Sequence, residues 1–198
     1  MGFDLYGISP KENTIKPKIL KQEFSDLNKD QYEDYFAASN EYQSKNPGSY
    51  FRANVWYWRP IWSFVCGACE DFLTKTDMKK GGLNDGALIS KTKANKIAQR
   101  LKNLDKQGII DTYKEEMDDV VSKATEKNKA LEEIKKEISK KVEEKFGELV
   151  PNEYPEPYKK QWLEAQKAED WSANYPFSKN VLMKFVNFCE QSGGFEIC

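Results

Sequence analysis

The segment MGFDLYG, Met1 to Gly7, alternates apolar and polar side chains from Phe3 to Tyr6 and then stops at a glycine. A period of two residues is typical of a β-strand with one buried face. The last six residues, GGFEIC from Gly193 to Cys198, have the same pattern. We expect these two strands to pair, so that both ends of the sequence lie in one small sheet.

Three apolar stripes at helical spacing follow along the chain. Pro60 is placed to begin the first helix, because proline is favoured at the first helical position. Ser90 and Ser178 are placed to cap the second and third helices, and Gly108 and Gly193 to end them. We therefore predict an α+β fold, in which a small sheet that includes both terminal strands packs on several helices.

Two stretches look like additions to a single domain of residues 1–198. Residues 10–48 are polar and rich in lysine, with a helix expected over residues 29–43 before the breaker Asn46-Pro47-Gly48. Residues 115–170 are dominated by a charged, coiled-coil-like pattern. We interpret the first as a peripheral insertion and the second as a helical insertion within the domain.

The charged pattern predicts a helix of about 40 residues, which would be roughly 60 Å long. That length exceeds what a domain of this size can cover. Its second half must therefore find a partner, fold back at a break near residues 125–129, or project into solvent as an arm. An unpaired helix of this kind can also dimerise, so a homo-oligomer formed through it is one open alternative.

The composition excludes several classes of function. The 31 basic and 32 acidic residues give a net charge of −1, which disfavours nonspecific binding to nucleic acid or to an anionic membrane. No stretch has the roughly 18 apolar residues of a membrane span, and the first residues do not resemble a signal peptide. The sequence has no histidine, which excludes catalysis based on it. We expect a soluble intracellular protein and no cofactor.

The block YFRANVWYWRPIW, Tyr50 to Trp62, is the strongest candidate site. Only three basic residues are arginines, and two of them, Arg52 and Arg59, fall in this block. The block has three readings: core packing by Val55, Trp58 and Trp62, a partner-binding patch, or a ligand pocket. In a pocket, the guanidinium groups would hold an anion and aromatic rings would stack on the ligand. The ligand-binding residues would then be Arg52, Arg59, Trp56, Tyr57, Tyr50 and Asn54.

Other candidate residues carry weaker signals. Cys66 and Cys69 form a CxxC pair, which suggests zinc, but both lie in an apolar helical stripe where buried free cysteine is common. We expect no metal. Asp4 and Glu196 would be neighbours if the terminal strands pair, and Asp85 lies in the turn Asn84-Asp85-Gly86. These carboxylates form a possible secondary site for acid-base or metal chemistry.

The start MGFDLYG, the block from Tyr50 to Trp62, the tripeptide NDG at 84–86 and the end from Tyr175 to Cys198 together resemble a family of small uncharacterised bacteriophage proteins. The resemblance covers about 60 to 80 residues of the chain. It implies a viral protein that acts in the cytoplasm of the bacterial host, and small phage proteins of this kind often serve host takeover or counter-defence. It assigns no activity to any residue.

The sequence thus predicts a phage-encoded, non-enzymatic protein that binds a small anionic, nucleotide-like ligand in an aromatic-arginine pocket. The alternative is an interaction module that inhibits a host protein through the long charged helix. A carboxylate- or metal-dependent enzyme is the third possibility.

Overall fold

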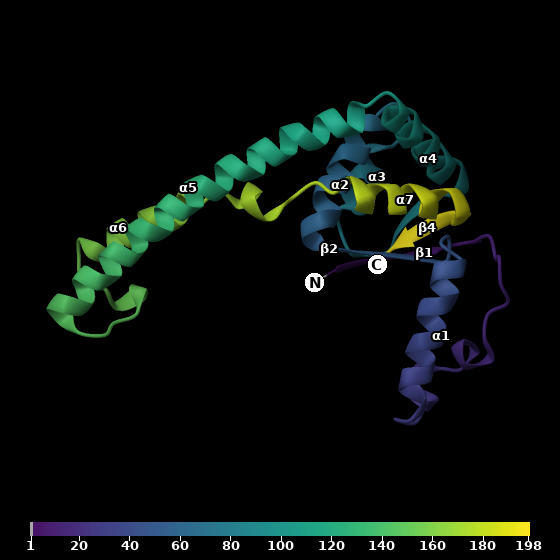
Figure 1. The fold of residues 1–198 in the computed structure, drawn as a ribbon, viewed down its shortest axis with the longest axis horizontal. Coiled ribbons are helices and arrows are strands. Elements are labelled where there is room, and N and C mark those ends of the chain that lie inside the picture. The colour runs from purple at the N-terminus through teal and green to yellow at the C-terminus, as the bar shows by residue number, and fades with distance from the viewer. Residues whose placement is uncertain (1) are drawn as a thin grey trace. The chain divides into compact units, whose positions relative to one another are not determined.

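The computed structural model describes residues 2–198 and has the predicted α+β fold (Figure 1). The strands are β1 (Gly2–Gly7), β2 (Tyr50–Asn54), β3 (Ala87–Ser90) and β4 (Gly194–Ile197). The helices are α1 (Gln31–Lys45), α2 (Val55–Ala68), α3 (Lys75–Gly81), α4 (Lys91–Lys106), α5 (Ile109–Phe146), α6 (Tyr158–Lys167) and α7 (Lys179–Gln191). Four short 3-10 turns are η1 (Lys18–Lys21), η2 (Phe24–Asp26), η3 (Pro151–Glu153) and η4 (Trp171–Asn174).

The four strands form an antiparallel sheet in the order β2-β1-β4-β3. The predicted pairing of the two terminal strands is confirmed: Leu5 lies opposite Ile197, and the Asp4 and Cys198 backbones exchange hydrogen bonds of 2.8 and 2.7 Å. The expected sheet lacked β2 and β3. β2 was not predicted because it lies in the aromatic block, whose apolar spacing indicates a helix. β3 was not predicted because it has only four residues.

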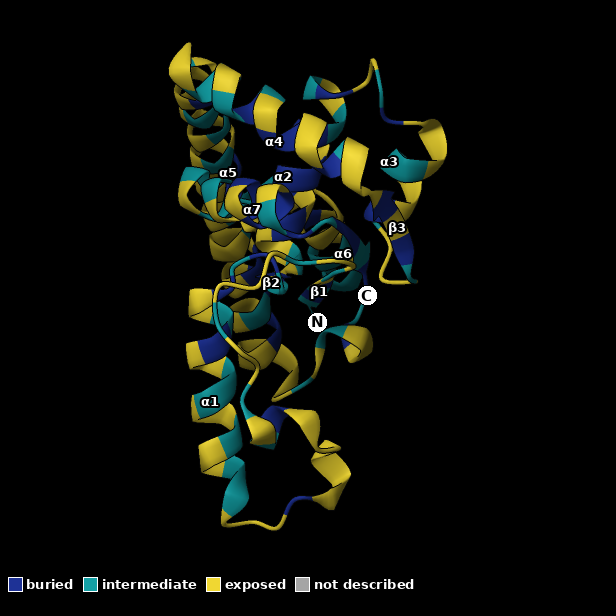
Figure 2. Ribbon diagram, turned by 90° about the vertical axis from the view of Figure 1, so that its right-hand side faces the viewer, coloured by how far each residue is buried: buried dark blue, intermediate teal, exposed yellow. Residues whose placement is uncertain are grey.

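One face of the sheet carries the hydrophobic core. Alternate residues of all four strands are buried there, and α2, α4 and α7 cover them, whereas α1 lies on the other side of the sheet (Figures 1 and 2). Phe195 of β4 contacts Phe185 and Phe188 of α7, at ring-centroid distances of 5.7 and 5.4 Å. Burying each such side chain contributes about 1.5–3 kcal/mol, so this face dominates the stability of the sheet.

The helix α2 begins earlier than predicted. It starts at Val55, so Pro60 lies inside the helix and not at its first position. Asn54 is the N-cap, and its Oδ1 accepts a 3.0 Å hydrogen bond from the Tyr57 backbone N–H. Pro60 is the sixth residue of the helix, so the helix lacks the hydrogen bond that a backbone N–H at this position would donate to the Trp56 carbonyl. The other two predicted caps are confirmed: the Ser90 and Ser178 hydroxyls accept from the backbones of Lys93 and Val181.

Two tryptophans of the aromatic block are core residues. Trp58 is fully buried and Trp62 nearly so, and their rings stack at 5.4 Å. Their indole N–H groups donate to the carbonyls of Gly81 and Met78, both at 2.9 Å. Both bonds go to α3, so the core reading of the block holds for these two residues. Val55, the third residue of that reading, is half-buried.

The chain divides into two compact units. Unit 1 comprises residues 1–112 and 178–198 and contains the sheet, and unit 2 comprises residues 113–177. In unit 2 the long helix α5 continues without a break through residues 125–129 to Phe146. It finds its partner in the same chain: Ile138, Val142 and Tyr154 form a buried cluster, with Tyr158 and Trp162 of α6 packed against it.

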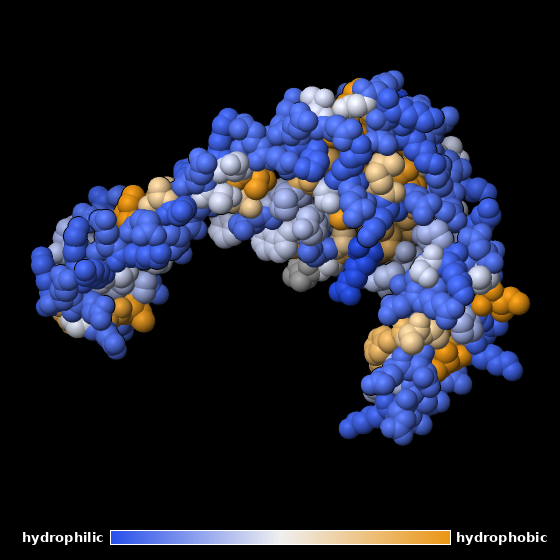
Figure 3. Space-filling view, in the orientation of Figure 1, coloured by the Kyte–Doolittle hydropathy of each residue, from blue (hydrophilic) through white to orange (hydrophobic). Residues whose placement is uncertain are grey.

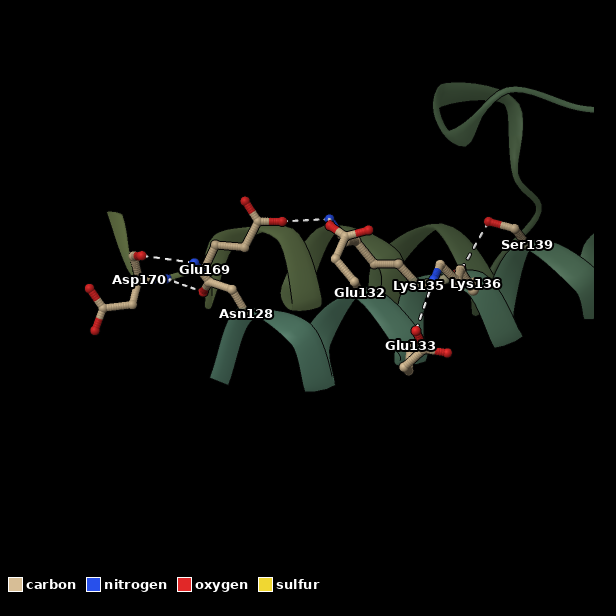
Figure 4. A network of polar contacts seen from close by, with 8 residues as sticks. All are labelled: Asn128, Glu132, Glu133, Lys135, Lys136, Ser139, Glu169 and Asp170. Carbon is tan, nitrogen blue, oxygen red and sulfur yellow. Dashed lines mark hydrogen bonds and ion pairs between the residues drawn. The ribbon is translucent and has the colours of Figure 1, made fainter. Parts of the chain in front are cut away.

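Polar contacts fix the pairing of α5 with the returning segment (Figure 4). The Asn128 side chain donates to the Asp170 carbonyl at 2.9 Å and accepts from the Asp170 N–H at 2.7 Å. Lys135, only 9% exposed, pairs with Glu132 and Glu169 and lies over the Trp162 ring. These hydrogen bonds raise the pKa of Lys135, so the ammonium stays charged in its buried position.

The substitution Gly81→Ala tests the packing of α3 on α2. A Cβ at Gly81 would lie 2.1 Å from the Trp62 ring, so we expect the free energy of unfolding to fall by about 1–3 kcal/mol. The matched control is Gly67→Ala, because a Cβ there meets nothing within 4 Å and alanine favours a helix by up to about 1 kcal/mol. Urea denaturation of both variants measures the difference, and equal stabilities would contradict this packing.

Candidate functional site

The face of the sheet opposite the core gathers several of the predicted site residues. The pleat that buries Phe3, Leu5 and Phe51 turns the intervening side chains the other way. The register places Asp4 opposite Arg52, Tyr6 opposite Tyr50, and Glu196 opposite Tyr6. Candidates from both ends of the sequence and from the aromatic block therefore share one surface, which we call the open face.

Asp4 links two of these residues. Its Oδ1 accepts a hydrogen bond from the Tyr50 hydroxyl and lies 3.5 Å from Arg52 Nε. Burial, and then the bond to Asp4, raise the pKa of Tyr50 well above its ordinary value, so the phenol stays protonated at neutral pH. The Tyr6 ring lies 5.3 Å from the Tyr50 ring. The open face thus presents two rings, a guanidinium and a carboxylate in fixed positions.

A groove of about 580 Å³ lies between this face and the segment that connects β1 to β2. Tyr6, Tyr50 and Arg52 form the sheet wall. The other wall comes from residues 16–43 and includes Lys16, Tyr35, Phe36, Ser39, Asn40 and Gln43. The volume falls in the range of pockets for small organic ligands. Residues 10–48, interpreted from the sequence as peripheral, therefore supply half of the groove.

Asn46 holds that outer wall in place. It is fully buried, and its Oδ1 accepts from the backbones of Asn13 and Thr14, at 2.6 and 3.1 Å. Its Nδ2 donates to Thr14 Oγ1 and to the Tyr42 carbonyl, at 2.7 and 2.8 Å. Every hydrogen-bonding position of the amide is used, which is the condition for burying such a group at low cost. The bonds join the start of the segment to the end of α1.

Aromatic contacts complete the wall. The Phe24 ring stacks on Tyr32 at 4.9 Å and meets the edge of Tyr35 at 5.3 Å, so η2 is anchored on α1. Phe24 and Phe36 are 42% and 55% exposed. Figure 3 shows apolar residues around α1 among hydrophilic ones. Exposed rings beside a groove are available for contact with a planar molecule.

The other half of the aromatic block does not line the groove. Trp56, Tyr57 and Arg59 follow the β2–α2 junction and lie on α2, where all three are exposed. Asn54 uses its side chain to cap that helix. The structure therefore places Tyr50 and Arg52 in the groove, and Arg59 with its two neighbouring aromatic residues on a helix.

Of the secondary candidates, Asp4 and Glu196 lie on neighbouring strands of the open face, and Asp85 lies in a turn. Asp85 lies in the turn before β3, where Gly86 has a φ of +82°, and Asn84 donates to the Gly2 carbonyl. Glu196 lies opposite Tyr6, whereas Asp4 makes its contacts with Arg52 and Tyr50. Among residues 2–198 no three His, Cys, Asp or Glu side chains gather in a group that would hold a metal ion.

Burial lowers the reactivity of the thiols of Cys66 and Cys69. It raises the pKa of Cys66 to about 11 and that of Cys69 to about 12. Both thiols are therefore protonated at neutral pH, whereas metal ligation and nucleophilic attack need the thiolate.

Sequence reasoning missed most residues of the groove, among them Tyr6, Lys16, Tyr35 and Phe36. A signal existed for Tyr6, because the alternation from Phe3 to Tyr6 puts it on the same face as Asp4. No local signal existed for the other three, because their position depends on how the segment folds back over the sheet.

Comparisons of the chain with protein-family models, with curated proteins and with solved structures find no match. The resemblance to phage proteins therefore stays a prediction. Across the described residues, every helix is too short or too polar to cross a membrane.

The environment of Tyr50 predicts an alkaline titration. Difference absorbance between the wild type and Tyr50→Phe should show a phenol that ionises well above the ordinary value of about 10, and Asp4→Asn should lower that pKa. Because the folded pKa exceeds the unfolded one, this group's contribution to stability is complete below about pH 10 and is lost as pH rises through the folded pKa. A Tyr50 that titrates with exposed tyrosines would contradict the contact with Asp4.

Proposed function

We propose that the protein is a non-enzymatic binding protein for a small anionic, nucleotide-like ligand, and that the ligand lies in the groove on the open face. The supporting observation is that the cations of Lys16 and Arg52 line the same groove as the rings of Tyr6, Tyr50, Tyr35 and Phe36. Cations and aromatic rings are what a phosphate attached to a planar base requires.

Arg52 would hold the anion. Its side chain is 65% exposed, and its contact with Asp4 is made through Nε. An exposed ion pair of this kind contributes about 0–1 kcal/mol, whereas a hydrogen bond to a charged group contributes about 1.5–3 kcal/mol. A phosphate group can therefore bind Arg52 without a large loss from the pairing with Asp4. Lys16, on the opposite wall, supplies a second positive charge.

The rings would hold the planar part. Tyr6 and Tyr50 belong to the sheet, where backbone pairing fixes them, and Tyr35 and Phe36 face them from α1. Stacking of a base on an aromatic side chain is worth about 1–3 kcal/mol. Tyr50 loses no freedom on binding, because its hydroxyl is already bonded to Asp4.

The biological setting is part of the proposal. The resemblance to phage proteins, together with a groove suited to a nucleotide, supports a role in the bacterial cytoplasm in which the protein sequesters a nucleotide-derived signal of host defence.

Arginine substitutions test the proposal. In calorimetric titrations with a panel of nucleotides, Arg52→Ala should weaken binding of the best ligand by about 10- to 100-fold. Arg59→Ala is the matched control, because that arginine is also exposed but lies on α2 outside the groove lining, and it should leave the affinity unchanged. If Arg59→Ala abolishes binding and Arg52→Ala does not, the ligand binds elsewhere.

A second candidate function is inhibition of a host protein through unit 2. The observation that favours it is Trp171 in η4, which is 65% exposed, since tryptophan often dominates protein interfaces.

A pair of tryptophan variants separates the two functions. If unit 2 binds a partner, Trp171→Ala should remove capture of that partner from bacterial lysate, and Trp56→Ala on α2 should not. Nucleotide binding in the groove should be the same in Trp171→Ala as in the wild type, because the residue is outside unit 1. A loss of nucleotide binding in Trp171→Ala would count against the groove as the site.

A further inference from the structure

The two oxygens of the Asp4 carboxylate have different surroundings. Oδ1 receives both the Tyr50 hydroxyl and the Arg52 Nε. Oδ2 takes part in neither contact. The side chain is 29% exposed. Oδ2 is therefore the carboxylate oxygen that these two contacts leave over, on a side chain that is partly exposed.

Asp4 is not itself among the residues that line the groove, but it contacts two residues that are, Tyr50 and Arg52. Tyr50 and Arg52 also hold the carboxylate from two sides, so its position is set before any ligand arrives. An ionised carboxylate accepts hydrogen bonds and donates none, so it selects ligands that carry donor groups.

Resting on the proposed function, we infer that Asp4 Oδ2 accepts hydrogen bonds from the sugar hydroxyls of the ligand, so that the ligand class is ribonucleotides. A planar base, a phosphate and vicinal hydroxyls match the three kinds of group at the site: the rings, the two cations and the carboxylate. Acceptance of ribose hydroxyls by a carboxylate is a general solution for nucleotide recognition. An aromatic anion without hydroxyls would leave Oδ2 unpaired beside a negatively charged ligand.

The negative charge of Asp4 increases the preference for ligands that carry hydroxyl groups. The carboxylate repels the ligand's phosphate and attracts its hydroxyl donors, so it weakens binding of a ligand that has only the phosphate. Removing the carboxylate should therefore lower the affinity for a ligand with the hydroxyls and not the affinity for an analogue that lacks only them. A residue that merely supports the fold would change both affinities together.

The probes are adenosine 5′-monophosphate and its 2′,3′-dideoxy analogue, titrated by calorimetry. The wild type should prefer the ribonucleotide by about tenfold or more. In Asp4→Ala the preference should disappear, because affinity for the ribonucleotide falls while affinity for the dideoxy analogue stays equal or rises. The matched control is Glu196→Ala, which removes a carboxylate of β4 from the same face and should keep the preference.

The possible failures are distinguishable. If neither nucleotide binds the wild type, the proposed function fails for this nucleotide and the inference fails with it. If both bind the wild type equally, the groove remains a ligand site and only the role of Asp4 is overturned. Should Asp4→Ala not fold by circular dichroism, Asp4→Asn replaces it, and a preference unchanged in that variant overturns the inference.

Discussion

The strand β1 is the constraint on which the rest of the structure depends. It pairs with β2 on one side and with β4 on the other, so it joins the two ends of the sequence and the aromatic block. Its pleat sends Phe3 and Leu5 into the core and Asp4 and Tyr6 to the open face. A slip of one residue would exchange the two sets, so core burial fixes the register of the site as well.

The two walls of the groove come from different parts of the chain: the sheet, and the segment that connects β1 to β2. The residues of the sheet wall alternate with buried residues, so packing in the core also fixes the positions of the wall residues. The outer wall belongs to a polar segment with few buried side chains. The hydrogen bonds of Asn46 hold the segment together, and close backbone contacts near Gly7 and Gly48 join it to the rest of unit 1. A Cβ on Gly7 would lie 2.1 Å from the Gly48 carbonyl oxygen, so these two segments of the chain meet where only glycine fits.

Local chemistry decided which parts of the fold were predictable. The terminal strands, the caps at Ser90 and Ser178 and the stop at Gly108 depend on a few adjacent residues, and the sequence indicates each of them. The predicted start of α2 was wrong because proline is favoured at the first helical position, which placed the start at Pro60, whereas Asn54 caps the helix at its actual start. The sequence did not predict the partner of α5, because its pairing with the returning segment depends on contacts between residues far apart in the sequence, such as Asn128 with Asp170.

The same reasoning explains what was predicted of the candidate site. Tyr50, Arg52 and Asp4 were singled out by residue type, but Arg59 was grouped with Arg52 because the two are near in sequence. A strand ends and a helix begins between them, at Asn54, and this junction places the two arginines on different elements. Lys16, Tyr35 and Phe36 were missed because the groove is formed by the return of one segment over another, which residue spacing does not encode.

The most direct test of this account is an NMR titration of isotope-labelled protein with adenosine 5′-monophosphate, which maps the residues whose signals change. The account predicts that the largest changes occur at Tyr6, Tyr50, Arg52 and Lys16, on both walls of the groove. Changes confined to Trp56, Tyr57 and Arg59 on α2, or to unit 2, would contradict it.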